Sequence, residues 1–194
     1  MAQWFNTSFF LHLHCLLNKE KVMPKETLPS FLNLDIKKLA EKKKKLVIAD
    51  LDNTLVLPYS TDVNASILLK IKKIQEAKIN FAILSNHAGN IQDDKTGRAK
   101  KLAGILGVEI LPCAYKKPHQ AAYFTYLEKY SATPEQTIVI GDRLLTDILG
   151  ANLLGIDSVL VDPLSNALDP WFVKIARKFE NNIMKWHKKE LKAD

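Results

Sequence analysis

The sequence has little arginine, little cysteine and no long uninterrupted apolar run. Of its 28 basic residues only three are arginines, and bidentate arginine is the usual reader of base edges, so the composition argues against sequence-specific nucleic-acid binding. Two cysteines, Cys15 and Cys113, cannot by themselves form a disulfide framework or a zinc site. No stretch reaches the roughly 18 to 20 apolar residues of a membrane-spanning helix, so we expect no transmembrane span.

The positive charge lies at the two ends of the chain. The formal net charge of +7 divides into +5 over residues 1–45, −2 over residues 46–169 and +4 over residues 170–194. Trp4–Leu17 is aromatic, amphipathic and free of acidic residues, as in a transit peptide or a helix lying in a membrane interface; packing onto its own domain explains it equally well. We treat residues 1–45 as an N-terminal amphipathic and basic lead-in.

The middle of the chain alternates short apolar runs with amphipathic helical periods. Five runs have the composition of buried strands: Leu46–Asp50, Asn80–Ser85, Val108–Leu111, Thr137–Gly141 and Ser158–Val161. Helical periods cover Ile67–Ala77, Ala99–Leu106, Ala121–Tyr130 and Leu144–Leu154. This alternation indicates βαβ units. We predict an α/β, Rossmann-like domain over residues 46–165, with a central parallel sheet and helices on both of its faces.

A last helix is predicted over Pro170–Leu191. Five large apolar residues recur there at spacings of four and three residues, which places them on one helix face: Trp171, Ile175, Phe179, Ile183 and Trp186. Residues 166–194 are therefore predicted to form a C-terminal amphipathic helix with a basic outer face.

Polar residues gather where the predicted strands end, which is where open parallel sheets bind ligands. They form four stations: Asp50-Leu51-Asp52-Asn53-Thr54, Ser85-Asn86, Lys116-Lys117-Pro118 and Gly141-Asp142 through Asp147. Each station alone is compatible with a turn, a helix N-cap or a loop. Their order along the chain favours one shared site.

This ordered set resembles the haloacid dehalogenase-like (HAD) phosphatase superfamily over residues 46–162. Receiver domains also use a phosphorylated Asp, but there the acidic pair lies on a different strand. The resemblance implies Asp50 as the nucleophile and Asp52 as the general acid and base. Ser85 and Lys117 would hold the phosphoryl oxygens.

The resemblance also implies a wider phosphate cradle. Asn86 and the backbone amides after Asp50 would complete it, from Leu51, Asn53 and Thr54. Arg143 could bind a second substrate phosphate through its guanidinium group. A salt bridge that fixes its loop is the alternative role for Arg143.

Three nearby carboxylates, those of Asp50, Asp142 and Asp147, would repel one another without a cation. Oxygen donors with no His or Cys suit Mg²⁺. The resemblance gives Asp50, the Asp52 backbone carbonyl and Asp142 as the metal ligands, with Asp147 in support.

The spacing of the stations leaves no room for a cap domain. About thirty residues separate Thr54 from Ser85, and again Asn86 from Lys117, and one crossover helix with its loops uses these up. We therefore predict an open site, which suits a phosphate displayed on a large or membrane-bound molecule.

A narrower resemblance covers the chain from about Leu16 to Pro163. It is similar to the mitochondrial-type phosphatidylglycerophosphate phosphatase family in five segments: Asp52–Tyr59, Ser85–Asn90, Lys116–Pro118, Gly141–Ile148 and Ala151–Gly155. The resemblance implies removal of the terminal phosphate of phosphatidylglycerophosphate, a step toward cardiolipin.

From these patterns we expect a Mg²⁺-dependent phosphatase that acts on a phospholipid at an anionic membrane surface and binds no nucleic acid. The family implies a peripheral position on the matrix face of the inner mitochondrial membrane, or a cytoplasmic one in a bacterium. Two alternatives stay open: a HAD phosphatase for a protein or soluble phosphate ester, and a non-catalytic membrane-associated adaptor. The sequence leaves oligomerisation open.

Overall fold

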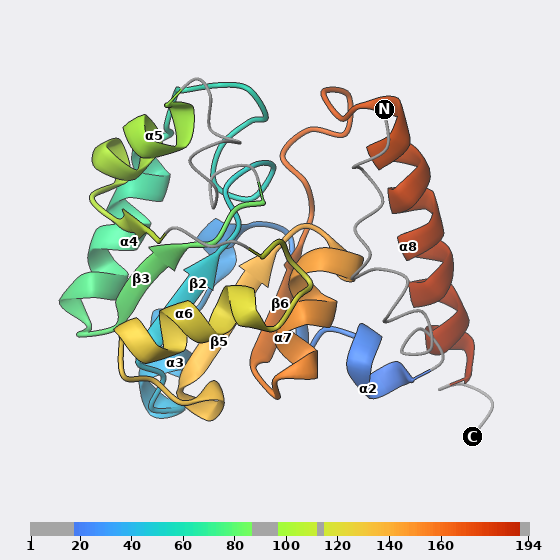
Figure 1. The fold of residues 1–194 in the computed structure, drawn as a ribbon, viewed down its shortest axis with the longest axis horizontal. Coiled ribbons are helices and arrows are strands. Elements are labelled where there is room, and N and C mark those ends of the chain that lie inside the picture. Colours follow the sequence, from blue (N-terminus) through green and yellow to red (C-terminus); the bar gives the residue numbers. More distant parts are fainter. Residues whose placement is uncertain (1–17, 87–96, 112–114, 191–194) are drawn as a thin grey trace.

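The structure is a computed structural model, and it describes residues 18–86, 97–111 and 115–190. Segment Trp4–Leu17 and both cysteines lie outside the described residues. The described part is built around one parallel sheet with helices packed on it, shown in Figure 1.

The sheet has six strands in the order β1-β6-β5-β2-β3-β4, and all neighbours are parallel. The strands are β1 (Glu26–Leu28), β2 (Leu46–Ala49), β3 (Asn80–Ile83), β4 (Glu109–Ile110), β5 (Thr137–Gly141) and β6 (Asp157–Val161). All five predicted strands are confirmed. β1 is an additional strand, which the sequence reasoning missed.

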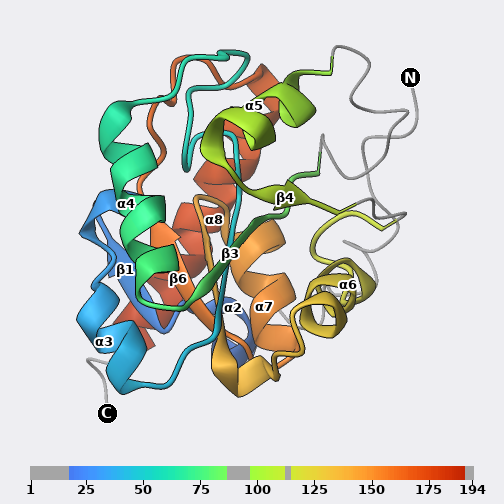
Figure 2. The same cartoon turned by 90° about the vertical axis from the view of Figure 1, so that its left-hand side faces the viewer.

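Helices cover both faces of the sheet, as predicted, and Figure 2 shows α4 and α6 on opposite sides of it. One face carries η2 (Phe31–Asn33), α3 (Ile36–Glu41), α4 (Ala65–Glu76) and α5 (Arg98–Leu106); the other carries α6 (Ala121–Lys129) and α7 (Leu149–Leu153). A short 3₁₀ turn, η3 (Pro134–Gln136), leads into β5. The central strands β2 and β5 are buried along their whole length, because side chains on both faces meet helices.

Alternate residues of the strands point to opposite faces of the sheet and pack in two separate hydrophobic cores. Val47 and Ile83 pack with Ile71 of α4 on one face. Ile48 packs with Tyr123 and Tyr126 of α6 on the other. This period-two alternation fixes the register of the sheet and therefore the edge at which its polar ends emerge.

The lead-in is fastened to the sheet from α2 (Lys19–Val22) onward. β1 pairs with β6, and the buried Asn152 Nδ2 donates to the backbone carbonyls of Lys21, at 3.0 Å, and Met23, at 2.8 Å. Asn152 Oδ1 accepts from Ser158 Oγ at 2.7 Å. Residues 19–28 thus form part of the folded domain.

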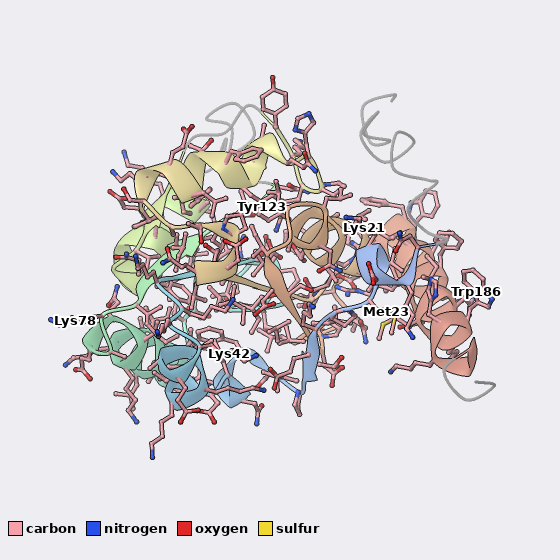
Figure 3. All side chains as sticks on the ribbon, turned by 90° about the horizontal axis from the view of Figure 1, so that it is seen from below. Lys21, Met23, Lys42, Lys78, Tyr123 and Trp186 are labelled. Carbon is pink, nitrogen blue, oxygen red and sulfur yellow. The ribbon has the colours of Figure 1, made fainter. Side chains whose placement is uncertain are left out.

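The C-terminal helix α8 (Trp171–Glu190) confirms the predicted element but has a different orientation. Of the five periodic apolar residues only Ile183 is buried, against Val22 of α2. Trp171 is 74% exposed and Ile175 58%, and Figure 3 shows Trp186 at the outer side of the helix. The predicted basic outer face is therefore wrong in part: the outer face is apolar, with exposed lysines beside it.

Among the described residues, the connections between strands hold no insertion of the size of a cap domain. The stretch from β2 to β3 holds α4, and the described stretch from β3 to β4 holds α5. This agrees with the prediction of no cap domain. Among the described residues, no helix has both the length and the hydropathy needed to cross a membrane.

Candidate active site

The polar stations meet at the carboxyl edge of the sheet around Lys117. Asp50 directly follows β2, and its backbone N–H donates to the Ile140 carbonyl of β5 at 2.9 Å. Lys117 Nζ lies 2.6 Å from Asp50 Oδ1 and 2.6 Å from Asp147 Oδ1. The structure therefore brings together three of the predicted site residues, from three separate segments of the chain.

Lys117 is held by both its backbone and its charge. The Asn86 side chain binds the Lys117 backbone through two hydrogen bonds. Asn86 Oδ1 accepts from the Lys117 N–H at 2.7 Å, and Asn86 Nδ2 donates to the Lys117 carbonyl at 3.2 Å. Burial alone would lower the pKa of Lys117, but Asp147 and Asp50 outweigh it and raise that pKa above its usual range. Lys117 is thus a permanent cation, which suits it to hold phosphoryl oxygens.

Asp147 is held in place by a π-helical turn, η4 (Leu144–Ile148), after β5. The Arg143 backbone N–H donates to Asp147 Oδ2 at 3.1 Å. Tyr123 Oη, from the core, donates to the carbonyls of Thr146 and Asp147 at 3.1 and 3.2 Å. π-turns are frequent at functional sites, and here one lets an interior carboxylate face Lys117.

Asp50, Asp142 and Asp147 form a set that can hold a metal ion. Each offers a carboxylate oxygen, and these oxygens all lie within 4.8 Å of one another. Burial, followed by repulsion from Asp50 and Asp147, raises the pKa of Asp142 to about 7. Crowded, buried, oxygen-only donors fit a divalent cation, which would offset this repulsion. The predicted ligands Asp50 and Asp142 belong to this set, and so does the supporting Asp147.

Asp52 lies apart from this cluster and pairs with Arg98 at the start of α5. Arg98 Nη2 lies 2.8 Å from Asp52 Oδ1, and Nη1 lies 3.3 Å from Oδ2. The same guanidinium group donates to the backbone carbonyls of Ser60, at 2.7 Å, and Leu57, at 3.2 Å. Arg98 therefore fixes Asp52 to the loop that follows it.

The remaining residues predicted to bind phosphate take different positions. The Leu51 side chain packs in the core, and Thr54 and Ser85 are buried. Asn53, with a positive φ of 62°, points its side chain away: Nδ2 donates to Asp169 Oδ1 at 2.8 Å, and Oδ1 accepts from the Ser165 N–H at 3.0 Å. The Asn53 backbone N–H donates to the Val56 carbonyl at 2.8 Å. Of these two residues, therefore, only Leu51 offers a group toward phosphate, its backbone amide.

Two arginines connect α8 to this edge. Arg143 Nε lies 3.1 Å from both carboxylate oxygens of the buried Glu180. Of the two roles considered for Arg143, this contact matches the salt bridge that fixes its loop. Arg177 Nη2 pairs with Asp142 Oδ2, and its Nη1 donates to the Asp142 carbonyl at 3.0 Å. Arg177 Nε donates to Asp169 Oδ2 at 2.5 Å.

Sequence reasoning missed Arg98, Asp169, Arg177 and Glu180. One signal was available: the chain uses arginine three times among 28 basic residues. All three arginines pair with carboxylates at this edge of the sheet. Rarity of arginine in a lysine-rich chain thus indicates where a planar, forked donor is needed.

Comparisons with known proteins agree on one family. The family described as "Mitochondrial PGP phosphatase" matches residues 7–165. The chain is 32% identical to the Arabidopsis thaliana protein named phosphatidylglycerophosphate phosphatase 1, over 90% of this chain and 51% of that protein. It is 34% identical to the Chlamydomonas reinhardtii protein of that name, over 84% of this chain and 61% of that protein. The chain thus spans half to three-fifths of the length of these two relatives.

A fungal relative is covered more fully. The chain is 32% identical to a mitochondrial phosphatidylglycerophosphatase of Saccharomyces cerevisiae, over 74% of this chain and 79% of that protein. Among solved structures, the cobalt-bound deoxy-D-mannose-octulosonate 8-phosphate phosphatase of Haemophilus influenzae is 21% identical with a TM-score of 0.46, over 76% of this chain and 90% of that one. The family match and the curated relatives identify the chain as a member of the mitochondrial phosphatidylglycerophosphate phosphatase family.

Proposed function

We propose that this protein hydrolyses the terminal phosphate monoester of phosphatidylglycerophosphate, with Mg²⁺ as its metal, to give phosphatidylglycerol and inorganic phosphate. One observation supports this most directly: Lys117 joins Asp50 to Asp147 beside Asp142, at the carboxyl edge of the sheet, in a chain of this family. A nucleophilic carboxylate, a fixed cation and a metal-binding carboxylate set are the groups that phosphoryl transfer requires.

In the proposed reaction an Asp50 carboxylate oxygen attacks phosphorus, and the bond from phosphorus to the lipid oxygen breaks. Asp52 gives a proton to that leaving oxygen and later takes one from the attacking water. The second step cleaves the aspartyl-phosphate and restores Asp50. Lys117 and Ser85 hold the phosphoryl oxygens, with backbone amides after Asp50. Mg²⁺, held by Asp50 and Asp142 with support from Asp147, would neutralise charge on the phosphoryl group.

A lipid substrate is supported by the open edge and by the outer face of α8. Five large apolar side chains, which we call the α8 apolar stripe, are at least 37% exposed: Trp171, Phe172, Ile175, Phe179 and Trp186. Lys174, Lys178 and Lys185 are exposed on the same helix. An amphipathic helix with aromatic and basic residues suits the interface of an anionic bilayer. We therefore propose that the α8 apolar stripe docks on such a bilayer.

The position of α8 relative to the site strengthens this reading. Asp169, two residues before α8, contacts Asn53, and Arg177, in the first half of α8, contacts Asp142. α8 therefore connects the proposed bilayer-binding face, on its outer side, with the loops that carry Asn53 and Asp142, on its inner side. The names of the yeast and plant relatives support a mitochondrial location, and we propose the matrix face of the inner membrane.

The deciding experiment compares substrates. Purified protein with Mg²⁺ is given phosphatidylglycerophosphate in vesicles and, separately, a panel of soluble phosphate esters. We expect kcat/KM to be highest for the lipid. Asp50→Asn should lower turnover on the order of 10³-fold or more, while Asp62→Asn, an exposed acid outside the cluster, should not. Preference for a soluble ester would contradict the lipid assignment, and full activity of Asp50→Asn would contradict the mechanism.

A further inference from the structure

Arg177 of α8 is part of the candidate site although it lies outside every motif of the sequence. Its three donor nitrogens all have acceptors: Nε binds Asp169 Oδ2, while Nη1 and Nη2 bind the carbonyl and the Oδ2 of Asp142. The side chain of Arg177 is 13% exposed, and those of Asp142 and Asp169 are 2% and 5% exposed. This is a buried, charge-assisted arrangement rather than a surface ion pair.

The contact bears on metal binding, because Asp142 belongs to the carboxylate set that can hold a cation. A carboxylate has two oxygens, so Asp142 can bind Arg177 through Oδ2 and a cation through Oδ1. Because Arg177 also binds the Asp142 backbone, it fixes both ends of that residue. Loss of a partner that orients a metal-binding carboxylate or imidazole typically costs about tenfold to a hundredfold in metal affinity or activity.

Asp169 connects this contact to the first motif. Its Oδ1 accepts from Asn53 Nδ2 at 2.8 Å, and its Oδ2 accepts from Arg177. A chain of side chains therefore runs from the loop after Asp50 and Asp52, through Asp169 and Arg177, to Asp142. The two loops that carry the carboxylates are held at a fixed separation by residues that follow the sheet domain in sequence.

We propose that Arg177 is a positioning residue, which holds Asp142 in the orientation that binds the metal. This inference rests on the proposed function, because it assumes that the site binds Mg²⁺. Only a guanidinium group can make these three contacts, since the ammonium of lysine is a single point. Its removal should disorder Asp142 and weaken metal binding, without removing any group that contacts the substrate.

The test is titration calorimetry of Mg²⁺ into metal-stripped protein. Arg177→Gln and Arg177→Lys should raise the dissociation constant of Mg²⁺ by about tenfold to a hundredfold. Lys178→Gln removes a charge from the exposed neighbouring position and serves as the matched control, with an unchanged constant. If Arg177→Gln fails to fold, Asp169→Asn, which weakens the same contact, should give a smaller loss in the same direction.

A second readout separates positioning from general stability. With lipid substrate, excess Mg²⁺ should restore most of the kcat of Arg177→Lys. Mg²⁺ affinity in the arginine variants within twofold of wild type would overturn the inference, as would tighter binding, which would mean that Arg177 competes with the cation. Failure of the proposed function would give a different result from failure of this inference. In that case the wild-type protein itself would bind no Mg²⁺ or would hydrolyse no phosphate ester.

Discussion

Lys117 and Asp147 form an ion pair of 2.6 Å in which the side chains are 3% and 1% exposed. Asp50 accepts from the same ammonium group at 2.6 Å. One buried cation thus separates two carboxylates that belong to different loops. Removing it would leave both of them without this partner, and buried charges that lose a partner are costly.

Lys117→Met should therefore affect both catalysis and folding. We expect turnover to fall on the order of 10³-fold or more. In the metal-free protein, the free energy of unfolding should fall by about 3–5 kcal/mol, as measured by urea denaturation. Lys116→Met, at the exposed neighbouring position, is the control. Equal activity of the two variants would remove Lys117 from the mechanism.

The stability of the metal-free protein should depend on pH through Asp142. Burial and repulsion from Asp50 and Asp147 raise the pKa of Asp142 from 3.8 to about 7. The folded state therefore binds this proton more tightly than the unfolded state, so stability falls as pH rises from about 4 to about 7. Mg²⁺ binding should strengthen over the same range, because the cation replaces the proton.

Urea denaturation of wild type and Asp142→Asn across this pH range checks the effect. The variant has no titrating carboxyl at this position, so its stability should fall less with pH than that of wild type. Parallel pH profiles for the two proteins would show that Asp142 does not titrate there.

Gly141 should not tolerate a side chain. A Cβ built at this position would overlap the Cβ, Cγ and Oδ2 atoms of Asp147, so Gly141→Ala should push Asp147 away from Lys117. We expect the free energy of unfolding to fall by about 1–3 kcal/mol. Turnover should fall as well, because Asp147 would no longer be held against Lys117. Gly104→Ala is the matched control: it lies inside α5 with open space around it, and should stabilise by up to about 1 kcal/mol.

The α8 apolar stripe should bind anionic vesicles. Replacing Ile175 and Phe179 by Ser should weaken co-sedimentation with phosphatidylglycerol vesicles, while hydrolysis of a soluble ester stays unchanged. Phe124→Ser, at an equally exposed position on α6, is the control. Added salt should weaken binding as well, through screening of the lysines.

Other occupants of the stripe would give different results in these assays. Unchanged sedimentation of the Ile175 and Phe179 variant would contradict bilayer docking by this face. A shift in the oligomeric state of that variant, seen by light scattering, would assign the stripe to a second copy of the chain. Loss of vesicle binding only when residues 4–17 are deleted would assign docking to that segment.

The sequence predicted the parts of this molecule that depend on local pattern. Runs such as Leu46–Ala49 are apolar throughout, since both faces of a central strand are buried. β1 was missed because Glu26–Leu28 is a three-residue edge strand with no apolar run. The grouping of Asp50, Lys117 and Asp147 followed from one rule, that parallel strands end at a common edge.

Contacts between distant segments could not be predicted in the same way. Arg177 reaches Asp142 across 35 positions, and nothing in the helical period says which face of α8 meets the domain. The spacing of Trp171 and Ile175 favoured an apolar contact, but the helix docks through Arg177, Glu180 and Ile183. Polar pairs with a few specific partners outweighed apolar periodicity at this interface.

The hydrogen bonds from Asn152 to the carbonyls of Lys21 and Met23 limit where a protease could cleave the amino-terminal part of the chain. A protease that cut between Lys21 and Leu28 would remove at least one of the two carbonyls to which the buried Asn152 amide donates. Any amino-terminal cleavage that keeps both contacts must therefore fall upstream of Lys21, and amino-terminal sequencing of the protein from its native source checks this boundary.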